Sequence, residues 1–434
     1  MKAAGPSTIP EAFQLENGLR VFLVENHTTP SIAMNLTVLA GSRDEPDELA
    51  GTAMMTARLL DEGTKTRSSL EIADAIESVG GSIDTDCSFD RSAVFLAVLS
   101  RDIDLGLELV ADMVRHPLFS DESIENERDR TLAEIRSAMD RPQVVTGWEF
   151  NELVYGTHPL HRPVHGYPET IPLIKREHLL AYHERHFTPA NVMLSLVGDF
   201  DIPEMKARLE AILGSWESRP AAPTGLRKAP EPVQGVSAKF LNLESQQAHI
   251  YYGHLGIART DPAFYTLQVM DTILGAGAGL TARIPHRLRD EEGLAYTTFA
   301  SITNSAGSEA GKFLAYIATS PENVDAAIDG FIAEIDRIRT EPVSGDELAD
   351  AQAYLTGSFV FSFETNAQIA RFLINAELFG LGFDYVDTYP QYIQAVTADM
   401  IRQAAATYLS TTNHALVVGG PASAETSRIS GCGV

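Results

Sequence analysis

The sequence is poor in cysteine and in long apolar segments. It has two cysteines in 434 residues, Cys87 and Cys432, and neither belongs to a CxxC pair, which excludes a disulfide-rich scaffold and a cysteine-based zinc cluster. No run of about 18 apolar residues occurs, and the N-terminal residues lack the apolar stretch of a signal peptide. We therefore expect a soluble chain that does not bind a membrane.

Positive charge is also scarce. The chain has 33 Lys and Arg residues against 59 Asp and Glu residues, a net charge of −26. Such a balance repels phosphate backbones, so nucleic acid is not an expected partner. With 44% hydrophobic and 21% charged residues the composition is that of a globular protein. The length exceeds one domain of ~100–200 residues, which favours two domains or one duplicated unit.

The order of predicted elements repeats along the chain. From the strand at 31–42 in the first half and from the strand at 249–257 in the second, the order is strand, helix, helix, strand, strand, helix, helix, strand. Ser68, with Glu71 three residues later, is a capping box that opens the second helix. The predicted elements of the first half lie at 19–25, 31–42, 48–61, 69–79, 82–89, 92–100, 102–115, 121–139 and 191–199. Those of the second half lie at 249–257, 262–274, 281–291, 294–303, 312–319, 322–339, from 345 onward, and 414–420.

This grouping of strands and helices predicts an α+β fold of two homologous α/β sandwich halves. The spacing of about 220 residues indicates duplication, because solenoid repeats have periods of ~20–50 residues. We expect an N-terminal half at 1–218, a Pro-rich linker at 219–234 and a C-terminal half at 235–434.

The segment GTAMMTARLLDEGTKTRS, residues 51–68, resembles the zinc-binding segment of the pitrilysin and mitochondrial-processing-peptidase family of metallopeptidases. In that family the helix carries H-x-x-E-H, two imidazoles that hold zinc and a carboxylate that takes a proton from bound water. Here these positions are Met54, Ala57 and Arg58. A thioether, a methyl group and a guanidinium cannot bind zinc in this way, so the resemblance implies a degenerate metal site and no metal bound by this chain.

The family's third zinc ligand is a glutamate on a long downstream helix, and the resemblance assigns this position to Glu134. Glu127 lies two turns earlier on a similar face. Because an unpaired buried carboxylate is costly, we expect Arg58 to pair with Glu134 or Glu127 and to fill the place of the metal. The alternative is that Arg58 is a surface arginine and that both glutamates lie on a solvated helix face.

A second stretch, residues 271–296, resembles the family's Gly-rich turn, its Arg-containing helix and a terminal Gly-Leu-Ala-Tyr. The resemblance implies that Arg289 and Tyr296 bind the substrate backbone and stabilise a developing oxyanion, a role suited to a fixed cation and a phenol donor. The alternative is an arginine in a surface ion pair and a tyrosine at the end of a strand. Shorter family-like stretches, such as 155–159 and 197–199, extend the resemblance over nearly the whole chain.

Histidine is the remaining candidate metal ligand. His158, His161 and His165 lie close together in a loop, and His178, His183 and His186 lie on one predicted helix. Neither group has the spacing of a known zinc motif with a third ligand, so we expect surface or packing roles. No G-x-S-x-G motif is present, which leaves no candidate serine nucleophile.

The resemblance implies a bacterial zinc-less subunit of a heterodimeric zinc endopeptidase, in the cytoplasm or periplasm. Its expected partner is a homologous subunit with an intact inverted zinc motif, which would hold the zinc, and its expected substrates are unfolded peptides. This chain would have no catalytic residue of its own and would supply Arg289 and Tyr296. The alternatives are a structural or peptide-binding scaffold subunit without a role in proteolysis, and an independent hydrolase with another metal arrangement.

Overall fold

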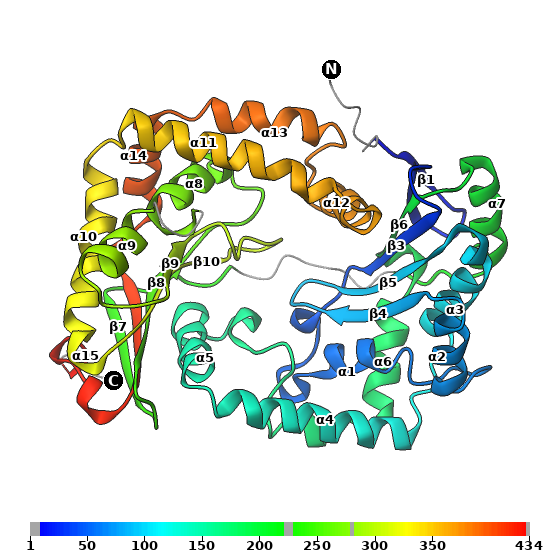
Figure 1. Cartoon of the computed structure of the whole chain (residues 1–434). Coiled ribbons are helices and arrows are strands. Elements are labelled where there is room, and N and C mark those ends of the chain that lie inside the picture. The colour runs from blue at the N-terminus through cyan, green and yellow to red at the C-terminus, as the bar shows by residue number, and fades with distance from the viewer. Residues whose placement is uncertain (1–8, 221–228, 278–281, 431–434) are drawn as a thin grey trace. The chain divides into compact units, whose positions relative to one another are not determined.

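A computed structural model describes residues 9–220, 229–277 and 282–430 (Figure 1). Part of the predicted linker and part of the Gly-rich turn lie outside these ranges. The chain forms two compact units. The first unit comprises Met1–Ile135, Pro163–Gly225 and Val360–Val386, and the second comprises Arg136–Arg162, Leu226–Phe359 and Asp387–Val434.

The first unit contains a six-stranded sheet in the order β1-β2-β6-β3-β5-β4. β2 and β6 are parallel, and the other neighbouring strands are antiparallel. The strands are β1 (Glu11–Gln14), β2 (Arg20–Glu25), β3 (Ser31–Val38), β4 (Ser82–Cys87), β5 (Ser92–Leu99) and β6 (Val192–Gly198). Five of these strands were predicted, and β1 was missed because its four residues are mostly exposed and carry no apolar alternation.

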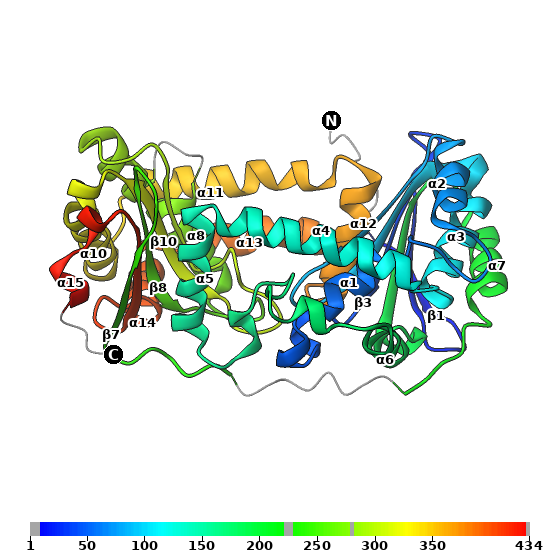
Figure 2. The same ribbon diagram turned by 90° about the horizontal axis from the view of Figure 1, so that it is seen from below.

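Helices cover both faces of this sheet. α3 and α7 lie on one face and α12 on the other (Figure 2). Alternate residues of β6 face the two layers: Leu194 and Leu196 join the core beneath α3, whereas Ser195 donates a hydrogen bond to the carbonyl of Ala370 in α12 at 2.8 Å. The helices of this unit are α1 (Thr52–Arg58), α2 (Ser69–Glu77), α3 (Ile103–Arg115), α4 (Asp121–Met139), which continues into the second unit, α6 (Arg176–His186), α7 (Ile202–Leu213) and α12 (Asn366–Leu378).

α1 is shorter than the helix predicted at 48–61. Gly51 precedes it with φ of +105°, a conformation that side-chain-bearing residues avoid, so the chain before Gly51 cannot continue the helix. A separate 3₁₀ turn, Asp47–Leu49, occupies part of the predicted range. The predicted capping box is confirmed, since the Ser68 side chain accepts from the Glu71 N–H and the Glu71 carboxylate accepts from the Ser68 N–H.

The second unit contains a five-stranded sheet in the order β7-β11-β8-β10-β9. β7 and β11 are parallel and the other pairs are antiparallel, as in the sheet of the first unit from β2 to β4. The strands are β7 (Val236–Asn242), β8 (Ala248–Leu255), β9 (Thr298–Ser301), β10 (Lys312–Thr319) and β11 (His414–Gly420). The shared strand order confirms the predicted duplicated α/β sandwich, and β7 is a strand that the sequence reading missed.

Helices also cover both faces of the second sheet. Tyr251 of β8 packs against Phe150 of α5, and the neighbouring Tyr252 packs against Phe331 of α10 on the opposite face. Two predicted helices contain π-helical turns, η7 (Thr272–Ala276) and η8 (His286–Glu291). The helices of this unit are α5 (Pro142–Tyr155), α8 (Phe264–Asp271), α9 (Arg283–Pro285), α10 (Val324–Thr340), α11 (Gly345–Phe359), α13 (Tyr385–Gln394), which begins in the first unit, α14 (Ala398–Tyr408) and α15 (Ser427–Ser430).

Two helices pack on a sheet whose strands come from a distant part of the sequence. α5, from the first part of the chain, packs on β8 and β11 of the second unit. α12, from the last part of the chain, packs on β3 and β6 of the first unit. Each sheet is therefore completed by a helix from the other end of the sequence. Among the described residues, no helix is both long and apolar enough to cross a membrane.

Candidate functional site

α1 is fixed at the base of the candidate site by a glutamate outside the sequence motif. The Glu45 carboxylate accepts from the Gly51 N–H at 2.9 Å and from the Ala53 N–H at 2.7 Å. These contacts cap the free N–H groups at the start of α1, where a negative charge is favourable. An acidic residue seven positions before the start of α1 was the only sequence signal for this role.

Arg58, the last residue of α1, pairs with both glutamates of α4. Its Nη1 lies 3.2 Å from Glu127 Oε1 and 2.8 Å from Glu134 Oε2. Glu127 is buried, with 3% of its side chain exposed, and it also pairs with Arg130 and accepts from the Thr131 hydroxyl. The pairing expected from the sequence is present, and Arg58 reaches both of the carboxylates that were considered.

The electrostatics of Arg58 agree with this geometry. Burial acts to lower the pKa of Arg58, but the hydrogen bonds and charges of Glu134 and Glu127 outweigh it, so the pKa is raised. The guanidinium therefore stays charged, and it neutralises carboxylates that would otherwise be available to a metal ion.

The side chains at this place do not fit a zinc ion. Met54 and Ala57 are buried in the core cluster of the first unit and offer a thioether and a methyl group. Both carboxylates already bind a fixed cation, and a zinc ion beside Arg58 would be repelled by it. Within the described residues, no group of three or more His, Cys, Asp or Glu side chains is arranged to hold a metal.

A further carboxyl group near Arg58 was not singled out from the sequence. Burial raises the pKa of Asp61 to about 6, and the charges of Glu62 and Glu127 raise it too, against the opposing charge of Arg130. Asp61 therefore adds a group that titrates close to neutral pH beside the Arg58 cluster. Its position three residues after Arg58 was the only sequence signal.

Arg289 and Tyr296 both lie in the second unit. Arg289, in η8, donates from Nε to the Asp290 carboxylate at 2.8 Å, and this bond is the main cause of its raised pKa. Tyr296 follows Gly293, whose φ is +65°, and is 92% exposed. Its hydroxyl has no hydrogen-bond partner in the described part of the chain, so its phenol group is available to a ligand.

In the second unit a buried arginine pairs with a partly exposed glutamate. Arg283 Nε and Nη2 lie 2.7 and 3.0 Å from the two carboxylate oxygens of Glu347, at the start of α11. The hydrogen bond from Arg283 is the largest cause that lowers the pKa of Glu347 to about 2. The pair joins α9 to α11 within this unit.

Several histidines are used in packing. His183 is buried, its Nε2 lies 2.9 Å from the Val114 carbonyl, and burial lowers its pKa to about 4. Burial likewise lowers the pKa of His186 to about 4. His158 is buried beside Glu309, with Nε2 and Oε2 3.0 Å apart. These contacts agree with the packing role expected from the sequence.

Comparison with known proteins identifies the family. Residues 20–166 match the family model described as Insulinase (Peptidase family M16), and residues 174–355 match the one described as Peptidase M16 inactive domain. An uncharacterized zinc protease of Mycobacterium leprae is 29% identical over 422 residues, which cover 95% of this chain and 92% of that protein. An uncharacterized zinc protease of Streptomyces coelicolor is 26% identical over 419 residues, with 96% and 90% covered.

Solved structures show the same fold. A peptidase M16 inactive domain from Pseudomonas fluorescens has a TM-score of 0.89 at 24% identity, with 96% of this chain and 99% of that chain covered. A protease from Helicobacter pylori has a TM-score of 0.88 at 20% identity, with 95% and 100% covered. The family models, the relatives and the fold agree with the resemblance seen in the sequence. This chain belongs to the pitrilysin-like insulinase family, peptidase family M16.

Proposed function

We propose that this chain is the zinc-less subunit of a heterodimeric zinc endopeptidase. The observation that carries the proposal is the pairing of Arg58 with Glu127 and Glu134, at 3.2 and 2.8 Å. A fixed cation lies where the resemblance puts a zinc ion, and it uses the carboxylates that remain of the metal site. A zinc-bound water, which such a peptidase needs for attack on the peptide, would then come only from the partner.

The contribution of this chain to the reaction would be made by Arg289 and Tyr296. A guanidinium and a phenol can both donate hydrogen bonds to a carbonyl oxygen as it gains negative charge. Tyr296 is exposed and Arg289 is bound only by its sequence neighbour Asp290 among the interactions described, so neither side chain is needed to hold the fold together. Exposure of a large aromatic side chain close to the charge of Arg289 supports a role in binding.

The first unit also offers a place for an extended peptide. β4 is an edge strand, paired in the described residues only with β5, and it packs beside α1. The open edge of a sheet presents backbone N–H and C=O groups that can pair with another strand. This supports retained peptide binding beside a metal site that has lost its ligands.

The test is reconstitution with a homologous chain that carries an intact H-x-x-E-H motif, sought first in an adjacent reading frame. The isolated chain should not cleave an unfolded fluorogenic peptide, and mixing with the partner should create cleavage that EDTA abolishes. In the reconstituted enzyme, Arg289→Ala or Tyr296→Phe should lower kcat by about 10²-fold, as loss of an oxyanion donor does. Arg402→Ala and Tyr354→Phe change exposed residues of the same unit and serve as matched controls.

Each outcome decides between the proposals. If the complex forms and cleaves but both substitutions leave kcat unchanged, the chain is a structural or peptide-binding scaffold subunit. If the isolated chain cleaves peptides and EDTA stops it, the zinc-less assignment is wrong.

A further inference from the structure

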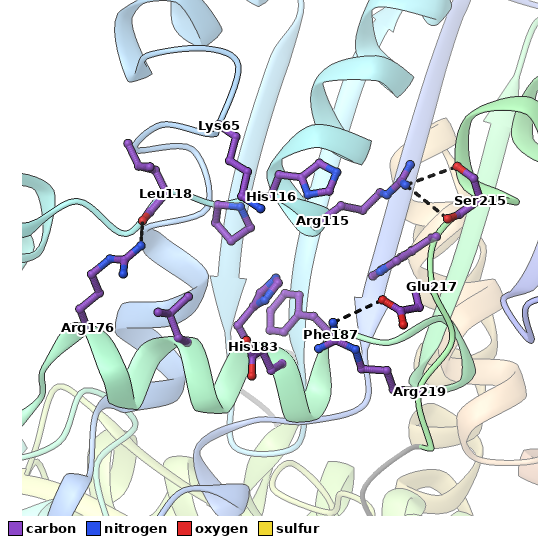
Figure 3. A pocket seen from close by; sticks show the side chains of 14 residues that line it. Lys65, Arg115, His116, Leu118, Arg176, His183, Phe187, Ser215, Glu217 and Arg219 are labelled. Carbon is purple, nitrogen blue, oxygen red and sulfur yellow. Dashed lines mark hydrogen bonds and ion pairs between the residues drawn. The ribbon is translucent and has the colours of Figure 1, made fainter.

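A basic cavity of about 600 Å³ lies in the first unit, between α6, the end of α3 and residues 215–219 (Figure 3). It is separate from the Arg58 cluster, with which it shares no lining residue. Its charged lining consists of four cations and two carboxylates: Lys65, Arg115, Arg176, Arg219, Glu184 and Glu217. An excess of positive side chains in one cavity is notable in a chain whose net charge is −26.

Two of these arginines are fixed by neutral acceptors. Arg176 donates to the carbonyls of Phe119 at 2.9 Å and Leu118 at 3.1 Å. Arg115 donates to the carbonyl of Ile212 at 3.1 Å. Backbone carbonyls orient a guanidinium without cancelling its charge, so both cations are held in place and remain able to attract an anion.

Lys65 and His116 lie next to each other in the cavity, and the charge of Lys65 acts on the His116 ring. Lys65 Nζ has no hydrogen-bond or ion-pair partner within residues 9–220, 229–277 and 282–430, and Figure 3 shows it beside His116. The pKa of His116 is lowered by burial first, and then by the charges of Arg115 and Lys65, against the opposing charge of Asp112. Of the two carboxylates, Glu217 pairs with Arg219 at 3.5 Å.

The rest of the wall is largely apolar. Phe187 stacks on the His183 ring, which burial keeps neutral, and Trp216 is buried beside them. Leu118 lines the cavity although it is 42% exposed. Figure 3 shows Arg176 and Arg115 toward opposite ends of the cavity, with Lys65 between them. A cation without a partner beside apolar side chains suits a ligand that has a negative group attached to an apolar body.

We propose that this cavity binds a carboxylate carried on an apolar group, with Lys65 at the carboxylate and Phe187 and Trp216 against the apolar part. Two sources share this chemistry: a small organic acid and the C-terminal end of a peptide with an apolar last residue. The proposal concerns only the first unit and does not depend on the peptidase role.

The experiment is a fluorescence titration of Trp216 in the full chain. The sequence has one other tryptophan, so Trp148→Phe leaves Trp216 as the only reporter. The probes are N-acetylphenylalanine and its amide, which differ only in the charged group. We expect the acid to bind at least tenfold more tightly than the amide, because a hydrogen-bonded charge contributes about 1.5–3 kcal/mol. A C-terminally free Ala-Ala-Phe peptide, set against its amide, distinguishes the peptide source.

Lys65→Gln should weaken binding of the acid about tenfold. It should leave the fold intact, since the hydrogen bond of Lys65 to the His116 carbonyl comes from its backbone N–H, which the substitution keeps. Arg101→Gln removes the same charge at an exposed residue outside the cavity and should leave binding unchanged. Equal binding of acid and amide, binding of inorganic phosphate in place of the acid, or unchanged binding by Lys65→Gln would each overturn the proposal. Tighter binding of the free tripeptide than of N-acetylphenylalanine would support it and identify a peptide ligand, and the reverse would support it and identify a small acid.

Discussion

Replacement of Arg58 by methionine tests how far the degenerate metal site depends on its cation. The substitution keeps an unbranched side chain of similar length and removes the guanidinium. A hydrogen bond to a charged group contributes about 1.5–3 kcal/mol when it is buried, whereas an exposed ion pair contributes under about 1 kcal/mol. Glu127 is 3% exposed and Glu134 is 44% exposed, so nearly all of the loss should come from Glu127.

The structure also limits the size of the loss. After Arg58→Met, Glu127 keeps its pairing with Arg130 and its bond from the Thr131 hydroxyl, so the carboxylate is not left alone. We expect a decrease of about 2 kcal/mol in the free energy of unfolding, below the ~3–5 kcal/mol typical of a fully isolated buried charge. Urea unfolding followed by far-UV circular dichroism measures it as a lower midpoint at unchanged slope.

A double variant measures the interaction free energy between Arg58 and Glu127 apart from the other effects of each substitution. Arg58→Met combined with Glu127→Gln should cost at least about 1 kcal/mol less than the sum of the two single variants, because the two side chains are in direct contact. Glu134→Gln is the matched control and should cost under about 1 kcal/mol, since it removes the same charge at an exposed position. The interpretation of Arg58 as the stabilising replacement for a metal would be refuted in either of two cases. In the first, Arg58→Met leaves the free energy of unfolding unchanged. In the second, the decreases caused by Arg58→Met and Glu127→Gln add up to that of the double variant.

Three further predictions follow from the same geometry. Restoring the inverted motif with Met54→His, Ala57→Glu and Arg58→His should give about one zinc per chain by mass spectrometry, and a variant without bound zinc would contradict the assignment of these positions. His183 binds no proton in the folded state until pH about 4, whereas the unfolded chain binds one near 6.5, so stability should fall as pH drops between these values. His183→Gln should remove up to about 3 kcal/mol of that fall, and an unchanged pH profile of the urea midpoint would contradict this. Arg283→Met should lower the free energy of unfolding by about 2 kcal/mol at pH 7. This difference from wild type should shrink as pH falls from about 4.5 to about 2, because the paired glutamate becomes protonated over that range. A difference that does not depend on pH would contradict the prediction.

The proposed degenerate metal site rests on residue types in the sequence. The resemblance assigns Met54 and Arg58 to positions where the family has zinc-binding imidazoles, and this prediction needs no coordinates. The sequence did not show which of Glu127 and Glu134 would pair with Arg58, because both lie on one face of α4 and differ only in burial. Glu45 and Asp61 were missed for the same reason: capping of α1 and a pKa near 6 both arise from neighbours that the fold brings together.

The fold was likewise predictable only in part. Apolar alternation and turn residues determined most of the central strands, and the repeated order of elements determined the duplication. The exposed strand β1 and the start of the short helix α1 were not determined, because β1 has little apolar patterning and α1 begins only after Gly51, a glycine in a left-handed conformation.

By itself, the sequence determined the family and the duplicated α/β architecture, because each depends on residue type and local periodicity. Only the tertiary structure decided that α5 completes the second sheet and α12 the first, that Arg58 reaches both glutamates, and that Lys65, Arg115 and Arg176 surround one cavity. These features depend on contacts between residues far apart in the chain. Such contacts are chosen by the burial of complementary faces, and a local pattern shows that a face is apolar or charged but does not show which other face will cover it.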